Sequence, residues 1–282
     1  MRNFCIKDSF SIWIVTYNRK NELNNTIRSL QKTMPSDIKI NIISNHSSLE
    51  LFEDYKNVKV YENNLRPDDS WGYLARNWNQ CYYLGLDKTE YVMCIQDDND
   101  IVDGWFELIN KHNSFEFYLA PVGDVSHIAS RSSFLKVGWW DERFICMDFH
   151  DYDYINRIHN TIKDTSSVVD RGLDVSWNSI GLENFLHGGG YKFDEDVFDR
   201  PRGHGWIHTR MNRIYYGKKR GKDFSDNVRC QKDSAWRDIN LKTVIDEVDW
   251  YPWFTSKMQK LTGKNQEFMK IPFESHYDHT GY

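Results

Sequence analysis

Three aspartates follow an apolar segment in the stretch YVMCIQDDND, which spans residues 91–100. Asp97, Asp98 and Asp100 lie so close together that their carboxylates repel one another unless a positive group offsets the charge. A divalent cation does this, and Mg²⁺ or Mn²⁺ prefers such oxygen ligands. A solvated acidic turn and a general acid–base pair are the two other interpretations. Because Mg²⁺ usually takes one or two carboxylates and fills its other positions with water and phosphate oxygens, the cation interpretation predicts half a metal site that a diphosphate completes.

The segments around this cluster predict alternating strands and helices. Short apolar runs predict strands at residues 11–16, 38–43, 58–61 and 91–95. Apolar residues at helical spacing predict helices after the first strand, with Asn18 or Asn21 as the N-cap, and before the fourth strand, and residues 103–112 look helical as well. The resulting β-α-β-β-α-β-α order predicts an α/β sheet with helices on both faces.

Polar clusters stand at the carboxyl ends of three predicted strands: TYNR (16–19), SNHSS (44–48) and QDDND (96–100). Open α/β sheets bind ligands outside the carboxyl ends of their strands. We therefore expect these clusters to converge on one crevice. Further along, we predict strands at 125–130 and 173–177 and a helix at 151–160, all within one domain that carries a C-terminal extension.

Composition excludes several classes of protein. The net charge is −5, whereas a nucleic-acid-binding protein normally has a basic surplus. No apolar run approaches the roughly 18 residues that a membrane span needs, and the first residues lack the apolar region of a signal peptide. The five cysteines are scattered and form no CxxC pair, which is typical of reduced thiols. We expect a cytoplasmic protein, and peripheral attachment to a membrane stays open.

Five motifs resemble those of inverting, family 2 type glycosyltransferases with a GT-A fold. In chain order they are SIWIVTYNRKNELNNTIRSL, QDDND, VGWWDERF, HDYDYINR and ENFLHGGG, which together cover about residues 10–195. QDDND resembles the DxD motif of that family. The resemblance implies a Rossmann-like, mixed but mainly parallel sheet flanked by helices. It also implies a transferase domain at 1–205, with a nucleotide-sugar half at about 1–124 and an acceptor half at about 125–205, and an extension at 206–282 packed on the same domain.

The resemblance further implies a nucleoside-diphosphate sugar donor, with UDP as the expected nucleotide. It places eight donor-binding residues at Thr16, Tyr17, Asn18, Arg19, Asn45, Arg76, Asn77 and Asp97. Ser44 stands where the family usually has an Asp that touches the base or ribose, and Asn45 is the expected substitute. Arg76 suits a phosphate, because a guanidinium donates a forked pair of hydrogen bonds.

The resemblance implies Mn²⁺ or Mg²⁺ as the cofactor, bound by Asp98, Asp100 and His187. Asp97 competes for this role, because the motif can be read as Asp98–Asn99–Asp100 or as Asp97–Asp98. Asp98 and Asp100 are two positions apart, so in an extended segment they point the same way and can share one ion. His204 and His208 are the alternatives to His187. The glycines at 188–190 would let the backbone approach a diphosphate, and the basic run at 200–222 is either a lid over the donor or a solvated loop.

The resemblance implies Asp151 as the catalytic base, with Asp148 and Asp153 as alternatives. His150 departs from the family, which usually has Glu there. Asp153 has a structural alternative as well, an ion pair with Arg157 one helical turn later. Trp139 and Trp140 are the expected acceptor-binding residues.

The expected reaction moves a sugar to a hydroxyl of a glycan or glycoconjugate acceptor, with inversion. A sugar-nucleotide pyrophosphorylase is less consistent with the sequence, since TYNRKNEL replaces the glycine-rich loop it would need. A non-catalytic or degenerate protein that binds carbohydrate or nucleotide sugar is the alternative. It would explain the 11 Trp, 16 Tyr and 16 Phe but not the acids at the strand ends.

Overall fold

The computed structural model describes residues 9–16, 19–45, 49, 51, 55–62, 74–101, 103–111, 116–119, 126–142, 144, 150–162, 168–169 and 186–188. These residues fall into two compact units. The first lies within Met1–Asp68, Cys81–Val137 and Ile158–Val197, and the second within Asp69–Gln80, Gly138–Arg157 and Phe198–Tyr282. Both predicted domain boundaries, after residues 124 and 205, and the extension at 206–282 lie outside the described residues and stay predictions.

The first unit contains a β-sheet with both parallel and antiparallel strand pairs, here called the main sheet. Seven strands are hydrogen-bonded in the order β3-β2-β1-β4-β7-β6-β8. Their bounds are Phe10–Thr16 (β1), Lys39–Ser44 (β2), Val58–Glu62 (β3), Tyr91–Gln96 (β4), Phe117–Leu119 (β6), Ser126–Ser130 (β7) and Val168–Val169 (β8). Only the pairs that involve β7 are antiparallel, so the sheet is mainly parallel as expected. A separate antiparallel pair joins β5 (Asn99–Ile101) to β9 (Leu186–Gly188).

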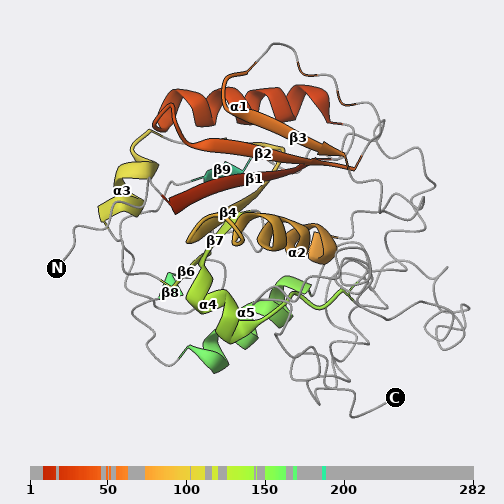
Figure 1. The fold of residues 1–282 in the computed structure, drawn as a ribbon, viewed down its shortest axis with the longest axis vertical. Coiled ribbons are helices and arrows are strands. Elements are labelled where there is room, and N and C mark those ends of the chain that lie inside the picture. Colours follow the sequence, from red (N-terminus) through yellow and green to blue (C-terminus); the bar gives the residue numbers. More distant parts are fainter. Residues whose placement is uncertain are drawn as a thin grey trace, which may run out of the picture. The chain divides into compact units, whose positions relative to one another are not determined.

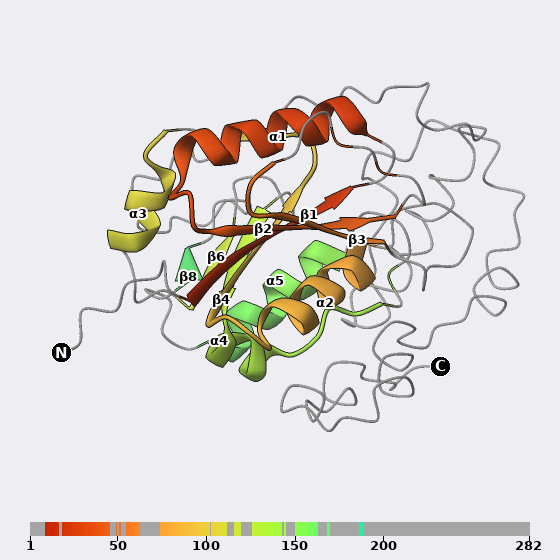
Figure 2. The same cartoon turned by 45° about the horizontal axis from the view of Figure 1, so that its top comes forward.

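Helices cover both faces of the main sheet. The helices are α1 (Lys20–Thr33), α2 (Leu74–Gly85), α3 (Trp105–Lys111), α4 (Arg131–Val137) and α5 (His150–Thr161). Figures 1 and 2 show α1 along one face, and α4 with the C-terminal part of α2 on the other. The ring of Tyr82 in α2 stacks on that of Phe134 in α4, with 4.5 Å between the ring centroids, and its centroid lies 5.7 Å from that of His127 in β7. These ring contacts hold α2 and α4 together against the sheet.

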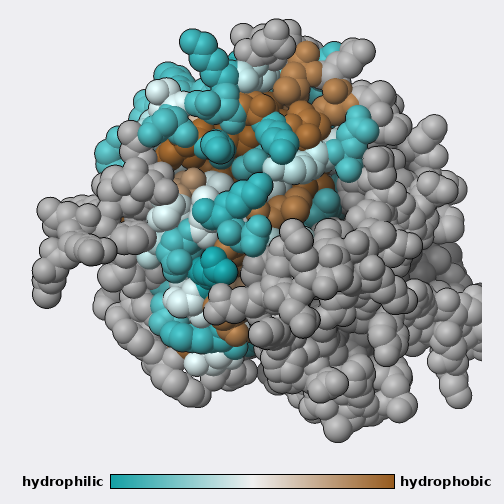
Figure 3. Space-filling view, viewed as in Figure 1, coloured by the Kyte–Doolittle hydropathy of each residue, from teal (hydrophilic) through white to brown (hydrophobic). Residues whose placement is uncertain are grey.

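The core between α1 and the sheet explains why these segments fold as they do. Leu23, Ile27 and Leu30 lie on one stripe of α1 and are fully buried. They pack against alternate residues of the strands, among them Ile12, Ile14, Ile40, Ile42, Met93 and Ile95. In Figure 3 hydrophilic residues cover much of the visible side in the region of α1, with hydrophobic residues showing between them. The central strands β1 and β4 are buried along almost their whole length, whereas β3 at the edge of the sheet exposes Lys59 and Glu62.

The structure confirms the predicted order of elements up to α3, the strand at 125–130 and the helix at 151–160. The predicted N-cap was wrong, because Arg19 occupies that position without a side-chain cap hydrogen bond, while Asn21 lies inside α1. The strand β5, which begins directly after Asp98, was not predicted. The predicted strand at 173–177 lies outside the described residues.

The described residues bear on two expectations from composition, namely reduced cysteines and the lack of a membrane span. Cys81 and Cys94 are buried free thiols. In the part of the chain that the structure describes, every helix is too short or too polar to cross a bilayer.

Candidate functional site

Asp97 and Asp98 form the turn that links β4 to β5 at the carboxyl end of β4. Asp97 is 5% exposed, and its Oδ2 accepts a 2.6 Å hydrogen bond from Oγ1 of Thr16 at the end of β1. Since β1 and β4 are parallel neighbours, their carboxyl ends lie side by side. The expected convergence of the TYNR and QDDND clusters is therefore confirmed for these residues.

Arg19 offsets the charge of this acidic turn. Its Nη1 lies 2.8 Å from Oδ2 of Asp98 and 3.7 Å from Oδ1 of Asp97. Burial of the guanidinium opposes its charge, but attraction to Asp97 and the hydrogen bond to Asp98 outweigh that cost and raise the pKa of Arg19. The side chains of Arg19 and Asp98 are 18% and 24% exposed, so the ion pair stays open to solvent.

Hydroxyl groups of α1 hold the acidic turn in place. Oγ1 of Thr26 accepts from the backbone N of Asn99 at 3.1 Å and lies within hydrogen-bond distance of the carbonyl oxygens of Asp97 and Asn99. One turn later, Oγ of Ser29 accepts from the backbone N of Ile101 at 2.6 Å and lies 3.0 Å from its carbonyl oxygen. The hydroxyls of α1 thus supply hydrogen-bond partners to backbone groups along one edge of β5, as a neighbouring strand would. Buried backbone groups need such partners.

The SNHSS cluster also reaches this edge of the main sheet. Asn45 donates its backbone N to the carbonyl oxygen of Thr16 at 3.0 Å, and Ser44 is the register partner of Thr16. Tyr17 and Asn18, two further expected donor-binding residues, lie outside the described residues. The edge therefore gathers Thr16, Arg19, Asn45, Asp97 and Asp98.

The structure describes the backbone positions of the three expected metal ligands, Asp98, Asp100 and His187. Asp100 of β5 is the register partner of His187 of β9, a position at which Cα atoms are about 4.5–5.5 Å apart. The argument that Asp98 and Asp100 share one extended segment was wrong, because Asp98 lies in the turn before β5. Among the described residues no group of three His, Cys, Asp or Glu side chains forms a metal site.

In the second unit, Arg76 and Asn77 lie near the start of α2, where both are buried. Arg76 Nε lies 3.7 Å from Oε2 of Glu142, whose side chain has no exposed surface. Asn79 donates from Nδ2 to Glu142 Oε1 at 2.8 Å and accepts from the backbone N of Trp140 at 2.8 Å. This network, here called the buried network, fixes Arg76 through protein contacts, and the expected contact to a donor phosphate stays untested.

The helix α5 distinguishes two of the candidate bases. Asp153 is fully buried and accepts from Nε of Arg157 at 3.1 Å, so its carboxylate already has a structural partner. Asp151 lies in the same first turn and is half-buried. The third candidate, Asp148, lies outside the described residues, as do His204, His208 and the glycines at 189 and 190.

Trp139 and Trp140 are 0% and 1% exposed. The ring of Trp140 stacks on Tyr154 of α5 at 4.0 Å and 11°, while the Tyr154 hydroxyl donates to the carbonyl oxygen of Gly138. In this structure both rings serve as core, and a sugar platform would need a ring face that opens.

Sequence reasoning missed the residues that position these groups. Thr26 and Ser29 are three positions apart in α1, which places both on one helical face, and this spacing is a usable signal for a hydroxyl pair. Glu142 lies within the motif VGWWDERF, but neither it nor Asn79 was assigned a role, because their contacts form only when distant segments of the chain meet.

Solved structures offer a limited likeness. The chain resembles the crystal structure of S. aureus TarS 1-349, with 14% identity, coverage of 91% of this chain and 92% of that one, and a TM-score of 0.45. It resembles GalNAc-T7 with UDP, GalNAc and Mn²⁺ at 12% identity, over 53% of this chain and 40% of that one, with a TM-score of 0.44. It also resembles the mannosyltransferase PcManGT from Pyrobaculum calidifontis, in complex with GDP-Man and Mn²⁺, at 10% identity, over 76% of this chain and 64% of that one, with a TM-score of 0.44.

The chain thus spans less than two thirds of the GalNAc-T7 and PcManGT chains. No model of a protein family matches it, and no curated protein matches it. With TM-scores of 0.45 or lower, the assignment of a function rests on the chain's own residues.

Proposed function

We propose that this chain is an inverting glycosyltransferase with a GT-A fold, which moves a sugar from a UDP-sugar to a hydroxyl of a glycan or glycoconjugate. One observation carries the proposal. Thr16 at the end of β1 and Arg19 after it, Asn45 after β2, and Asp97 and Asp98 after β4 gather at the carboxyl edge of the main sheet. This is the edge where α/β sheets bind their ligands.

The residues present fit Mn²⁺ or Mg²⁺, which prefer oxygen ligands. Asp98 keeps a solvent-exposed side, and Oδ1 of the buried Asn99 has no hydrogen-bond partner in the described part of the chain. The residues proposed to hold the cation are Asp98, Asp100 and His187. When bound, such a cation would supply charge neutralisation at a leaving diphosphate.

The chain's own residues divide the remaining work. Thr16 and Thr26 fix the acidic turn, so that the carboxylate of Asp98 keeps its place while ligands exchange. Arg19 offsets the negative charge of the two acids before any ligand binds. We assign Tyr17, Asn18 and Asn45 to the nucleotide, and Arg76, Asn77 and Asp97 to the rest of the donor.

Asp151 is the proposed base. It would accept the proton of the acceptor hydroxyl as that oxygen attacks the anomeric carbon and the bond to the diphosphate breaks. Attack from the face opposite to the leaving group gives inversion. Asp151 lies in the first turn of α5, where the partial positive charge of a helix N-terminus attracts a carboxylate.

The test is a screen of nucleotide sugars for thermal stabilisation and for Mn²⁺-dependent donor hydrolysis. We expect one UDP-sugar to stabilise the protein and to be hydrolysed, and Asp98→Ala to remove both effects. Asp103→Ala is the matched control, since Asp103 is an exposed aspartate beyond the same turn.

Stabilisation without hydrolysis or transfer would favour a protein that only binds the donor. If no nucleotide sugar had any effect, or if both variants behaved alike, the proposed function would be wrong.

A further inference from the structure

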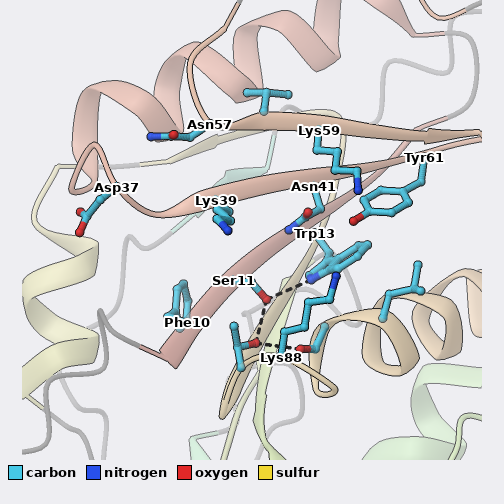
Figure 4. Close-up of a pocket in the computed structure, with 14 residues that line it drawn as sticks. Phe10, Ser11, Trp13, Asp37, Lys39, Asn41, Asn57, Lys59, Tyr61 and Lys88 are labelled. Atoms are coloured by element: carbon cyan, nitrogen blue, oxygen red, sulfur yellow. Dashed lines mark hydrogen bonds between the residues drawn. The ribbon is translucent and has the colours of Figure 1, made fainter.

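A pocket lies in the first unit, away from the acidic turn. This pocket has a volume of about 490 Å³ and lies beside the C-terminal end of α2 (Figure 4). Alternate residues of three neighbouring strands form its wall: Ser11 and Trp13 of β1, Lys39 and Asn41 of β2, and Lys59 and Tyr61 of β3. Thr16 has the opposite parity in β1, so it faces the α1 side of the sheet with the acidic turn.

The floor of this pocket is held in place by hydrogen bonds and close packing. Trp13 is 2% exposed, and its Nε1 donates to Oγ of Ser11 at 3.1 Å, which in turn lies 3.0 Å from Oγ1 of Thr89. A Cβ added at Gly85 would lie 2.7 Å from Nε1 of Trp13, so only glycine lets α2 approach this closely. The Tyr61 ring packs on Trp13 at 5.3 Å.

The rim of the pocket is positively charged. Lys39, Lys59 and Lys88 are exposed, and with Asp37 they give the described lining a formal charge of three minus one, or +2. Lys59 Nζ lies 4.5 Å from the centroid of the Tyr61 ring. Figure 4 shows Asp37 near the opposite end of the pocket from Lys59 and Tyr61. A positive hollow of this kind contrasts with a chain whose net charge is −5.

We propose that this pocket binds a phosphate-bearing ring compound, a sugar phosphate or a nucleotide. Lysine ammonium groups are compact point charges with three donors each, which suits the oxygens of a phosphate. The volume falls in the range of about 300–1,000 Å³ that small-molecule sites occupy. The ring of the ligand would lie against Tyr61, which packs on the buried Trp13.

This proposal is independent of the proposed transferase function. The acidic turn repels phosphate unless a cation is bound, whereas the lysines attract it without one. Binding in the presence of EDTA therefore separates the two sites.

Calorimetric titration of the full chain in EDTA tests the proposal, with pyrophosphate, glucose 6-phosphate and uridine monophosphate as probes. We expect at least one probe to bind, and Lys59→Gln/Lys88→Gln to weaken it about tenfold or more, because two charged hydrogen bonds are lost. The matched control is Lys32→Gln/Lys136→Gln, which removes the same charge from α1 and α4.

If glucose 6-phosphate binds more tightly than uridine monophosphate, the ligand is a sugar phosphate. If uridine monophosphate binds more tightly, the ligand is a nucleotide. The proposal is wrong if none of the three probes binds, or if the pocket and control variants lose affinity equally. Circular dichroism of both double variants checks that each is folded.

Discussion

The acidic turn and the buried network both contain an arginine near a carboxylate, yet they differ in their access to water. In the acidic turn, the Asp98 side chain is 24% exposed and the Arg19 side chain 18%. In the buried network, Glu142 is 0% exposed and Arg76 9%. A charged group that keeps contact with solvent can exchange its partner for a ligand. Breaking a fully buried ion pair costs much more free energy, because a buried charge is left uncompensated. The Arg19–Asp98 pair should therefore exchange a partner for a ligand more readily than the Arg76–Glu142 pair, although the residue types are similar.

The same contrast occurs within the first turn of α5, and it yields the largest expected effect. Asp151→Asn should lower the rate of transfer by about 10²–10⁴-fold, because a general base is lost, while the free energy of unfolding stays nearly constant. Transfer rates and urea unfolding measure the two quantities. Asp153→Asn should do the reverse and lose stability, because Arg157 is left without its carboxylate partner. Normal turnover by Asp151→Asn would reject the assignment of the base.

Removal of a sealed carboxylate should be the next largest effect. Glu142→Ala removes the buried carboxylate that Arg76 and Asn79 contact, and we expect the free energy of unfolding to fall by about 3–5 kcal/mol. Urea denaturation followed by circular dichroism measures the loss. Glu116→Ala is the control, since its pair with Lys136 is exposed and should be worth about 1 kcal/mol or less. Equal losses in the two variants would mean that burial does not set the difference.

A smaller effect should follow when the support of the acidic turn is removed. Thr26→Val keeps the shape of the side chain but leaves the backbone N of Asn99 unpaired, which should cost about 1–3 kcal/mol. Thr26→Ser retains the hydroxyl and should recover most of that stability. Chemical denaturation compares the two variants. If Thr26→Ser were the less stable one, packing of the methyl group would matter more than the hydrogen bonds.

The smallest effect should come from the open ion pair itself. Arg19→Gln should change the free energy of unfolding by about 1 kcal/mol or less, because solvent screens the charges. The difference from the wild type should shrink in 1 M salt, where the Debye length is about 3 Å. Unfolding curves at low and high salt measure it. If Arg19→Gln lowered the free energy of unfolding as much as Glu142→Ala, the Arg19–Asp98 pair would behave like a buried ion pair, and the comparison would be wrong.

Much of the fold could be predicted from the sequence, because the strands up to β4 are apolar runs and α1 and α2 show helical spacing. The meeting of Thr16, Arg19 and the aspartates also followed from the carboxyl-end rule. The role of Glu142 could not be predicted, since its partners Arg76 and Asn79 come from a distant helix. The pairing of β5 with β9 was equally hidden, because strands of three residues carry almost no periodic signal.

The pairing of β5 with β9 has a consequence for folding during synthesis. The acidic turn leaves the ribosome well before Leu186–Gly188, and at about 5–20 residues per second the delay is on the order of ten seconds. Until then, the hydroxyls of α1 are the partners available to β5. A nascent chain would therefore complete the sheet from β1 to β4 early and acquire the Asp100–His187 register late, so a chain truncated before residue 186 would lack that pairing.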